Sequence, residues 1–385
     1  MEPGISIVIP IHNGAAYLDA CLKAIGALRP APLECIVVDD GSTDGSAQVA
    51  RAAGVTVIST PGRRGPAFAR NRGAAAARGE ILLFVDADVV VPPDTLSRLA
   101  ASFSEDPARD AVIGSYDREP AGPSLLSQYR NLLHCYTHQR GQTRTCGFWT
   151  GCGAIRKAVF CAHGGFDQAY TRPCMEDLEL GLRLRQAGRQ IWLDKGLQVK
   201  HLKQLRFWRV MKTDMVDRAI PWTRLILRSH EMPVDLNLKW GQRFSVLASG
   251  WAALALILSA VFAASSGARL AAAALAFSAA LAAFIVAALN RDFYRFLAHV
   301  RSPWFAFAAF PLHCLYFLCG GAGFAAGLAA HGCVLCGRWL FPHEPRADEP
   351  LCLGLTEPAA AIVRPQAADL PSAPTSSCPA VPPNV

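Results

Sequence analysis

The stretch from Ile81 to Val91 constrains this chain most, because it places two carboxylates, Asp86 and Asp88, at the end of a run of five apolar residues. Apolar side chains in succession, without alternation, are typical of a strand covered on both faces, as in a parallel sheet. Strands of that kind end at the crevice where ligands bind. A divalent cation held between the acids and a phosphate would keep both carboxylates ionised there. An isolated Asp-x-Asp triplet is more often a solvated acidic turn, so its surroundings have to decide.

Strand-like and helix-like segments alternate around this stretch. The predicted strands cover 5–11, 33–38, 55–59, 81–85, 111–115 and 191–202, and the predicted helices cover 17–28, 48–53, 66–78, 92–103 and 125–138. This alternation predicts an α/β fold with a doubly wound, mixed but mainly parallel sheet and right-handed crossovers. Polar residues follow three of the strands, where a ligand would bind: His12, Asn13, Asp39, Asp40, Asp86 and Asp88.

A dinucleotide-binding oxidoreductase would share this layout of strands and helices. Such a protein needs a G-x-G-x-x-G turn after its first strand, and the turn here contains only Gly14. The phosphate-binding loop G-x-x-x-x-G-K-S/T of nucleotide hydrolases is also missing from the sequence. If this domain binds a nucleotide, it uses acids and a metal rather than a glycine-rich cradle.

A series of motifs resembles the family 2 glycosyltransferases, which have the GT-A fold and are inverting enzymes with nucleotide-sugar donors. The motifs occur in the family's order: VIPIHN (8–13), VVDDGSTDGS (37–46), GPAFARNRG (65–73), FVDAD (84–88), GFD (165–167) and the pair Glu176-Asp177. His12 departs from the family, which more often has tyrosine or another residue there. Polymer-making relatives carry Q-x-x-R-W, and the string that begins at Gln204 has a different spacing, which disfavours processive synthesis.

The resemblance implies a donor site at the strand ends. Pro10, Asp39 and Asp40 would line the nucleotide base and ribose, because carboxylates accept hydrogen bonds from base N–H groups and ribose hydroxyls. Asp86 would hold the ribose. Arg70 and Asn71, with Arg64 nearby, would face the uracil or the diphosphate. Arg64 is equally compatible with a solvated loop charge.

The resemblance also implies a metal site and a base. Asp88 would bind Mg²⁺ or Mn²⁺ together with the donor phosphates, which offsets the charge that develops on the departing nucleoside diphosphate. His201 would be a further ligand, although a lone histidine is usually structural. Asp177 would deprotonate the acceptor hydroxyl as general base, with Glu176 supporting it or binding the acceptor. Without the other motifs, Glu-Asp at a helix start is more often a favourable charge near the helix dipole.

The small residues around Gly151 leave two interpretations open. They would let the sugar or the acceptor approach the backbone closely, or they form an ordinary turn into a strand.

The second half of the chain predicts a membrane region. The chain is 52% hydrophobic with a net charge of +8, and the apolar excess lies after Phe244. The segments 244–268 and 270–289 are long enough to span a bilayer, and a third segment, 304–330, is interrupted by Pro311 and two glycines. One of these runs could instead be a buried core helix.

The flanking segments indicate how the parts are arranged. Ten Lys or Arg against four Asp or Glu lie between Lys200 and Arg243, mixed with aromatic residues, which predicts interfacial helices at 204–243 rather than a nucleic-acid surface. The loop between the second and third apolar segments carries more arginines than the loop before it, which places the catalytic domain, 1–203, in the cytoplasm. The start of the chain has no secretory signal, which agrees with this. The Pro- and Ala-rich tail, 338–385, is predicted to be disordered.

These observations predict a multi-pass protein of a bacterial-type inner or plasma membrane that acts as an inverting glycosyltransferase. It would transfer a sugar from a nucleoside-diphosphate donor, with UDP expected, to a membrane lipid or lipid-linked acceptor in cell-envelope glycan or glycolipid synthesis. The alternatives are a membrane scaffold that keeps the fold without the chemistry, and a nucleotidyltransferase. The clustered acids argue against the scaffold, and the lack of a basic glycine loop argues against the nucleotidyltransferase.

Overall fold

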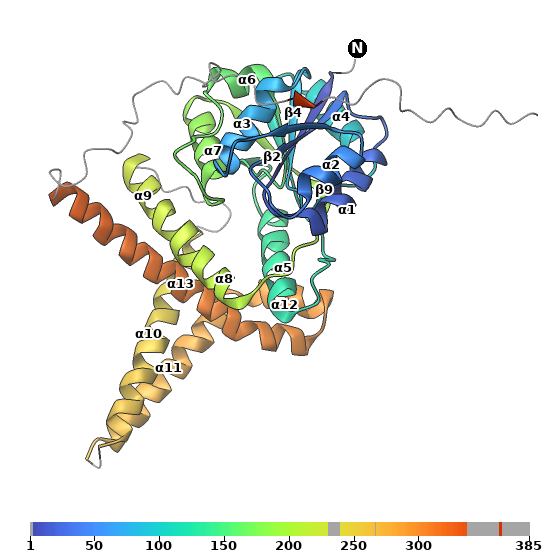
Figure 1. Cartoon of the computed structure of the whole chain (residues 1–385). Helices are drawn as coiled ribbons and strands as arrows, with labels where there is room; N and C mark the ends of the chain where they lie inside the picture. Colours follow the sequence, from blue (N-terminus) through green and yellow to red (C-terminus); the bar gives the residue numbers. More distant parts are fainter. Residues whose placement is uncertain (1–2, 230–238, 266, 337–361, 364–385) are drawn as a thin grey trace, which may run out of the picture.

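The computed structural model describes residues 3–229, 239–265, 267–336 and 362–363. Figure 1 shows a sheet domain built from the first half of the chain and a group of long helices on one side of it. The predicted tail, 338–385, lies outside the described residues except for its two-residue strand.

The sheet has the strand order β10-β3-β2-β1-β4-β8-β6-β9-β5, with β7 paired to β9. The pairs β1·β2, β1·β4, β2·β3 and β6·β9 are parallel, whereas β8 is antiparallel to both of its neighbours. The predicted mixed, mainly parallel sheet is therefore confirmed. The strands are β1 (Ile5–Ile11), β2 (Glu34–Asp39), β3 (Thr56–Ser59), β4 (Ile81–Val85), β5 (Val89–Val90), β6 (Arg109–Tyr116), β7 (Arg144–Thr145), β8 (Cys152–Arg156), β9 (Gln190–His201) and β10 (Ile362–Val363).

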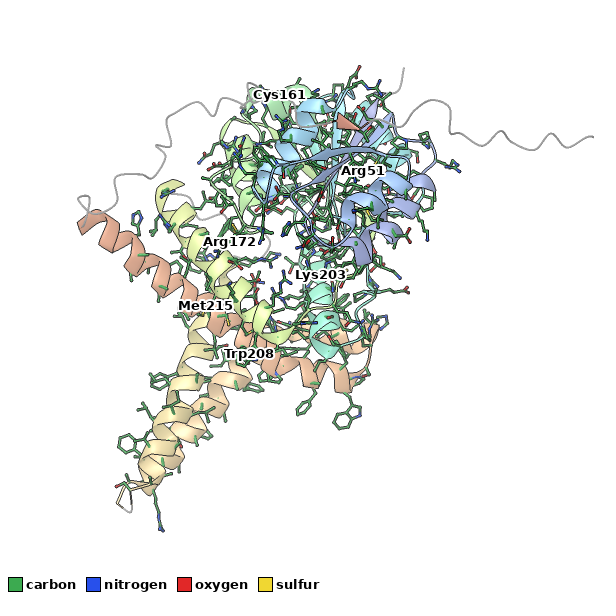
Figure 2. All side chains as sticks on the ribbon, viewed as in Figure 1. Arg51, Cys161, Arg172, Lys203, Trp208 and Met215 are labelled. Carbon is green, nitrogen blue, oxygen red and sulfur yellow. The ribbon has the colours of Figure 1, made fainter. Side chains whose placement is uncertain are left out.

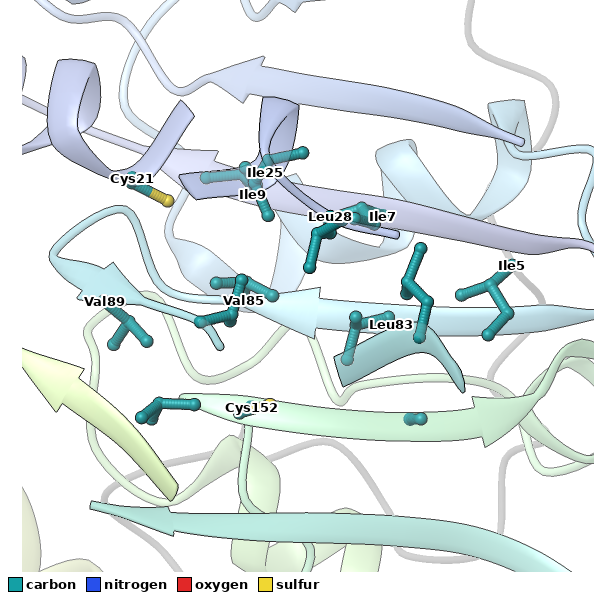
Figure 3. Packing of buried hydrophobic residues seen from close by; sticks show 14 of the residues in the cluster. Ile5, Ile7, Ile9, Cys21, Ile25, Leu28, Leu83, Val85, Val89 and Cys152 are labelled. Atoms are coloured by element: carbon teal, nitrogen blue, oxygen red, sulfur yellow. The ribbon is translucent and has the colours of Figure 1, made fainter. Parts of the chain in front are cut away.

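Helices cover both faces of the sheet. The helices of this domain are α1 (Ala15–Gly26), α2 (Ser46–Ala52), α3 (Pro66–Ala76), α4 (Thr95–Glu105), α5 (Leu125–Gln139), α6 (Lys157–Ala162) and α7 (Glu176–Gln186). One buried apolar cluster joins the sheet to α1, α2 and α4, and Figure 3 shows part of it, with Ile7 and Ile9 of β1 near Ile25 and Leu28. A second cluster joins the opposite face to α3, α6 and α7. Because both faces are covered, the central strands are apolar throughout.

Strand β8 changes the sheet that the early strands alone would build. It runs between β4 and β6 and pairs Val85 with Cys152 and Phe84 with Gly153. An added Cβ at Gly153 would lie 2.3 Å from the Trp149 carbonyl oxygen, so the turn into β8 requires glycine there. The turn into a strand, one of the two interpretations of this region, is therefore present.

The second half of the chain is helical. Its helices are α8 (Phe207–Lys212), the π-helix η1 (Thr213–Ala219), α9 (Ile220–Ser229), α10 (Trp240–Ala263), α11 (Arg269–Leu289), α12 (Arg291–Val300) and α13 (Pro303–Cys336). Among the described residues, three helices are long and apolar enough to cross a membrane: Trp240–Ala263, Arg269–Leu289 and Pro303–Gly332. The third is a single helix with Pro311 inside it. Large apolar side chains such as Leu270, Phe277 and Phe307 are exposed on these helices, which suits contact with lipid.

The helical region docks on the sheet domain through α5 and α12. Tyr129 and Leu132 of α5 share a buried apolar cluster with Phe293 and Leu297 of α12. At the edge of this contact, the Arg301 guanidinium donates to the Gln128 side-chain oxygen at 2.7 and 2.9 Å. Figure 1 shows α10 and α11 side by side, projecting away from the sheet domain, with α13 crossing between them and that domain.

Candidate active site

A cavity of about 1710 Å³ lies between the carboxyl ends of the strands and the helices η1, α9, α10 and α13. Figure 2 shows two of its lining residues, Arg172 and Lys203, in the region between the sheet domain and these helices. Most of the residues singled out from the sequence line this cavity: Pro10, Asp40, Arg70, Asp86, Asp88, Glu176, Asp177 and His201.

A buried arginine ties two of the acidic motifs together. Arg70 of α3 is 4% exposed, and its guanidinium donates to Asp86 Oδ1 at 2.7 Å and to Glu176 Oε1 at 2.9 Å. Burial opposes the charge of Arg70, but the negative charges of Asp86 and Glu176 outweigh it and raise the pKa of Arg70 above its ordinary value. Arg70 and Glu176 are therefore held in fixed positions beside Asp86, and Glu176 is engaged by Arg70 rather than free for the solvent.

Asp177 lies at the start of α7 and faces the same cavity. Its Oδ1 accepts a hydrogen bond from the Leu178 backbone N–H at 2.8 Å, and the Thr150 hydroxyl approaches Oδ2 at 3.5 Å. Burial, followed by the negative charge of Glu176, raises the pKa of Asp177 to about 7. A carboxyl group with that pKa is matched to proton transfer near neutral pH.

Asp88 and His201 are brought together by a short antiparallel ladder. Strand β5 pairs Val89 with His201, and the Leu202 backbone N–H donates to the Asp88 carbonyl oxygen at 2.8 Å. His201 Nε2 lies 3.6 Å from Asp88 Oδ2, and Lys203 Nζ lies 3.3 Å from the same oxygen. Burial opposes the carboxylate form, but the polar contacts with His201 and Lys203 outweigh it and lower the pKa of Asp88 to about 2.

The surroundings of His201 fit a metal ligand. His201 Nδ1 lies 2.8 Å from Asn131 Oδ1, and the Asn131 amide nitrogen is engaged by the Ser127 carbonyl oxygen, so Nδ1 is the donor of this pair. Nε2 is then the ring nitrogen left for a metal, and it faces the Asp88 carboxylate at a distance longer than a hydrogen bond. Within the described part of the chain, no group of three His, Cys, Asp or Glu is arranged to hold a metal, so further ligands would have to come from donor phosphates or water.

Asp40 shapes the wall of the cavity. Its carboxylate accepts hydrogen bonds from the backbone N–H groups of Arg64 and Gly65 at 2.8 and 2.7 Å. Gly65 has a φ of +101°, and an added Cβ would lie 2.6 Å from the Thr171 carbonyl oxygen. The carboxylate is therefore committed to holding this loop against the segment before α7.

Four predicted donor or sugar contacts do not line the cavity: Asp39, Arg64, Asn71 and Gly151. The Asp39 carboxylate caps its own turn by accepting from the Ser42 backbone N–H at 3.0 Å. The Asn71 amide is 4% exposed and both accepts from and donates to the backbone of Phe166. The Arg64 guanidinium is exposed and lies over the Phe68 ring, as the alternative of a solvated loop charge predicts. An added Cβ at Gly151 would lie 2.3 Å from the Trp149 ring, so this glycine accommodates an indole.

An aromatic group that was not predicted from the sequence lies beside His201. The Tyr116 ring stacks on His201 with a centroid distance of 4.7 Å, and the Trp149 ring packs edge-on against Tyr116 at 4.9 Å. His134 of α5 contacts both of these rings, and all three residues line the cavity. The end of a strand pointed to Tyr116, whereas no local pattern pointed to α5 or to Lys203.

Comparison with known proteins agrees with this geometry. Residues 6–162 match the family model described as Glycosyl transferase family 2. Residues 6–162 form a family 2 glycosyl transferase domain. This confirms the resemblance, and the match covers most of the sheet domain, including β2 and β4, the strands that precede Asp40 and Asp86.

Several curated proteins are similar to the domain. Validoxylamine A glucosyltransferase of Streptomyces hygroscopicus subsp. limoneus is 30% identical over 240 residues, which cover 52% of each chain. Succinoglycan biosynthesis protein ExoA of Rhizobium meliloti is 26% identical over 254 residues, covering 59% of this chain and 75% of that protein. The chain spans 40% of the length of glycosyltransferase GlyG of Streptococcus pneumoniae and 57% of a pre-mycofactocin glycosyltransferase of Mycobacterium tuberculosis.

A solved structure supports the fold beyond the domain. The mannosyltransferase PcManGT from Pyrobaculum calidifontis, solved in complex with GDP-Man and Mn²⁺, superposes with a TM-score of 0.51 at 18% identity. The superposition covers 84% of this chain and 88% of that one, so the likeness extends over part of the helical region. The GT-A fold predicted from the motifs is therefore confirmed.

Proposed function

We propose that this chain is an inverting glycosyltransferase that moves a sugar from a nucleoside-diphosphate donor to a hydroxyl group of a membrane lipid or lipid-linked acceptor. The expected nucleotide of the donor is UDP. One observation carries the proposal. A single cavity joins Asp177, whose pKa is about 7, to the Asp88–His201 pair on one side and to the helices α10 and α13 on the other.

The donor binds at the strand ends in this proposal. Pro10 and Asp40 border the nucleotide, and Arg70 orients Asp86 toward the ribose through their 2.7 Å contact. Asp88 and His201 would hold Mg²⁺ or Mn²⁺, which when bound would supply positive charge beside the departing diphosphate. Lys203, 3.3 Å from Asp88, adds a second cation on that side of the cavity.

The transfer itself uses Asp177. The acceptor hydroxyl attacks the anomeric carbon from the face opposite the diphosphate, and its proton passes to the Asp177 carboxylate. The new bond between the acceptor oxygen and carbon forms as the bond between carbon and diphosphate oxygen breaks, which inverts the configuration. Burial, followed by the negative charge of Glu176, which is paired to Arg70, raises the pKa of this base.

The membrane acceptor follows from the helices that border the cavity. Val246 and Leu247 of α10 and Phe317 and Phe324 of α13 line it, and both helices are long and apolar enough to cross a membrane. Helix α12, which connects α11 to α13, packs on α5 of the sheet domain. The arginine-rich connection and the sheet domain therefore lie on one side of the bilayer, the cytoplasmic side by the positive-inside rule.

The test uses the purified full chain in lipid nanodiscs with UDP- and GDP-sugars and Mg²⁺ or Mn²⁺. We expect the wild type to release a nucleoside diphosphate. Asp88→Ala should lose metal-dependent donor binding, and Asp177→Asn should bind the donor without turning it over. A wild-type protein that binds no nucleotide sugar with any metal would instead support the idle scaffold.

A further inference from the structure

The wall of the cavity that faces the membrane helices has no role in the transfer described so far. It is formed by η1, whose residues Asp214, Asp217 and Arg218 line the cavity. A π-helix is a rare form that is frequently found at functional sites. These polar side chains are therefore candidates for binding the acceptor.

Asp214 is a buried carboxylate with one oxygen in use. It is 6% exposed, and its Oδ1 accepts from Arg130 Nη2 at 2.6 Å. Its Oδ2 is buried and has no hydrogen-bond partner among the described residues. A buried carboxylate oxygen that is left unpaired costs free energy, which a hydroxyl donor from a ligand would recover. Asp214 is thus suited to accept a hydrogen bond from a hydroxyl in the cavity.

Positive charge surrounds this position. Arg209 and Lys212 of α8 and Arg218 of η1 line the cavity, and in the described part of the chain none of the three has a carboxylate within ion-pair distance. Arg218 lines the same cavity as His134 of α5. Three cations without partners favour an anionic ligand, and a phosphate ester matches the forked geometry of arginine.

The position of η1 is fixed by close packing on α13. An added Cβ at Gly323 would lie 2.4 Å from Ala219 Cβ, and one at Gly327 would lie 2.6 Å from Thr223 Cβ. Small residues four apart let the two helices touch along their backbones. Gly320, one turn before Gly323, also lines the cavity, and an added Cβ there would meet nothing within 4 Å. Space for a hydrocarbon chain therefore opens beside the polar wall.

We propose that η1 holds the headgroup of the acceptor, and that the acceptor is a lipid phosphate ester with a free hydroxyl. Asp214 Oδ2 accepts from a headgroup hydroxyl, Arg218 pairs with the phosphate, and the hydrocarbon chain lies between α10 and α13. This inference rests on the proposed function, since it names the acceptor class of the same cavity. A glycerophospholipid and a phosphate-linked polyprenyl saccharide share this chemistry.

Native mass spectrometry of the full chain from phosphatidylcholine nanodiscs would test the proposal. The added lipids are phosphatidylglycerol, which has a phosphodiester and hydroxyls; phosphatidylethanol, which lacks the hydroxyls; diacylglycerol, which lacks the phosphate; and a polyprenyl diphosphate-linked disaccharide. We expect phosphatidylglycerol or the polyprenyl saccharide to be retained about tenfold better than the other two. Whichever of these two lipids is retained identifies the lipid class of the acceptor. Equal retention of diacylglycerol would overturn the proposal.

Two variants assign the contacts. Asp214→Asn should remove the preference for phosphatidylglycerol over phosphatidylethanol, and Arg218→Met, which leaves the Arg130 pair intact, should lower retention of both phosphate lipids by about tenfold. Asp292→Asn and Arg295→Met on α12 are matched controls outside the cavity lining. Variants that retain lipids as the wild type does would contradict the assignment.

A separate measurement keeps the two proposals distinguishable. Binding of UDP with Mn²⁺ to the same variants should equal that of the wild type, because Asp214 and Arg218 lie on the acceptor side. If no variant or wild-type protein binds UDP, the proposed function fails whatever lipid is retained.

Discussion

At the scale of single residues, the environment of each carboxylate decides its chemistry. Asp88 and Asp177 lie in one cavity, yet the pKa of Asp88 is about 2 and that of Asp177 is about 7. Desolvation acts on both, but cationic and polar neighbours outweigh it at Asp88, whereas the negative charge of Glu176 adds to it at Asp177. Two carboxylates of one site are thus separated into a permanently charged group and one that exchanges protons near neutral pH.

The raised pKa of Asp177 predicts a pH dependence of transfer. Below about pH 7 the carboxyl group is protonated and cannot act as a base, and above it the carboxylate predominates. We expect kcat/KM to rise with pH through about 7 in steady-state assays from pH 5 to 9. Asp177→Asn should lower kcat by about 10²- to 10⁴-fold and remove the acid limb. A flat profile in the wild type would exclude Asp177 as the base.

Replacing Lys203 is expected to strengthen metal binding and to weaken nucleotide binding. Its ammonium group shares Asp88 Oδ2 with His201, so it competes with a divalent cation in the absence of nucleotide. Lys203→Met should bind Mn²⁺ more tightly without nucleotide, as measured by electron paramagnetic resonance, and bind UDP with Mn²⁺ about tenfold more weakly.

Lys200→Met is the matched control for this prediction. Lys200 also flanks His201, but it lies 3.6 Å from Glu119 rather than near Asp88. Equal changes in both variants would mean that only the net charge of the strand matters.

At the scale of elements, several conspicuous motif residues position the backbone. Asn71 on α3 is hydrogen-bonded to both backbone groups of Phe166, at 2.8 and 2.9 Å, and so fixes the segment that follows α6. Phe166 in turn packs against Phe84 of β4 with a centroid distance of 5.1 Å. The motif asparagine therefore joins a helix, a loop and the strand that ends at the acids.

Asn71→Ala is expected to act on stability more than on donor binding. It removes two buried hydrogen bonds and leaves the Phe166 backbone groups unpaired, which costs about 2–4 kcal/mol. Thermal unfolding of the purified chain should occur several degrees lower. At temperatures where the variant is folded, UDP binding should be within about twofold of the wild type. An unchanged unfolding temperature together with a loss of UDP binding would mean that Asn71 contacts the donor.

At the scale of the whole molecule, the sheet domain is fastened to the helical region on one side. The contacts between α5, α12 and α13 and the Arg130–Asp214 pair connect the catalytic cavity to helices that are apolar enough for a membrane. The turn between α10 and α11 is the part of the helical region farthest from the sheet domain in Figure 1. This arrangement fits a hairpin that crosses the bilayer and returns.

The arrangement predicts a topology. Reporter fusions after Ser265, in the turn that follows α10, should be active on the outer side of the membrane. Fusions within α12 should report the same side as the N-terminal domain, because α12 packs on α5. A reporter after Ser265 that is active on the side of the sheet domain would mean that the hairpin lies on the surface of the membrane instead.

The sequence by itself determined the family and the order and type of most elements of the sheet domain, although it did not predict β5, β7, β8 or α6. Apolar runs, helical periodicity and turn residues are local, so β1 and β4 begin and end at the predicted residues. The strand ends also brought Asp40, Asp86 and Asp88 to one edge, because parallel strands share that edge. Only the tertiary structure decided which motif residues face the cavity.

Arg70 pairs with Glu176, which lies 106 residues further along the chain. The Asn71 side chain donates to the backbone of Phe166. Strand β8 lies between β4 and β6 in the sheet. Likewise, the sequence shows η1 only as part of a basic and aromatic stretch, and the structure shows that it packs on α13 and forms part of the cavity wall. The physical reason is that the direction of a side chain depends on partners far away in the sequence, which no local pattern records.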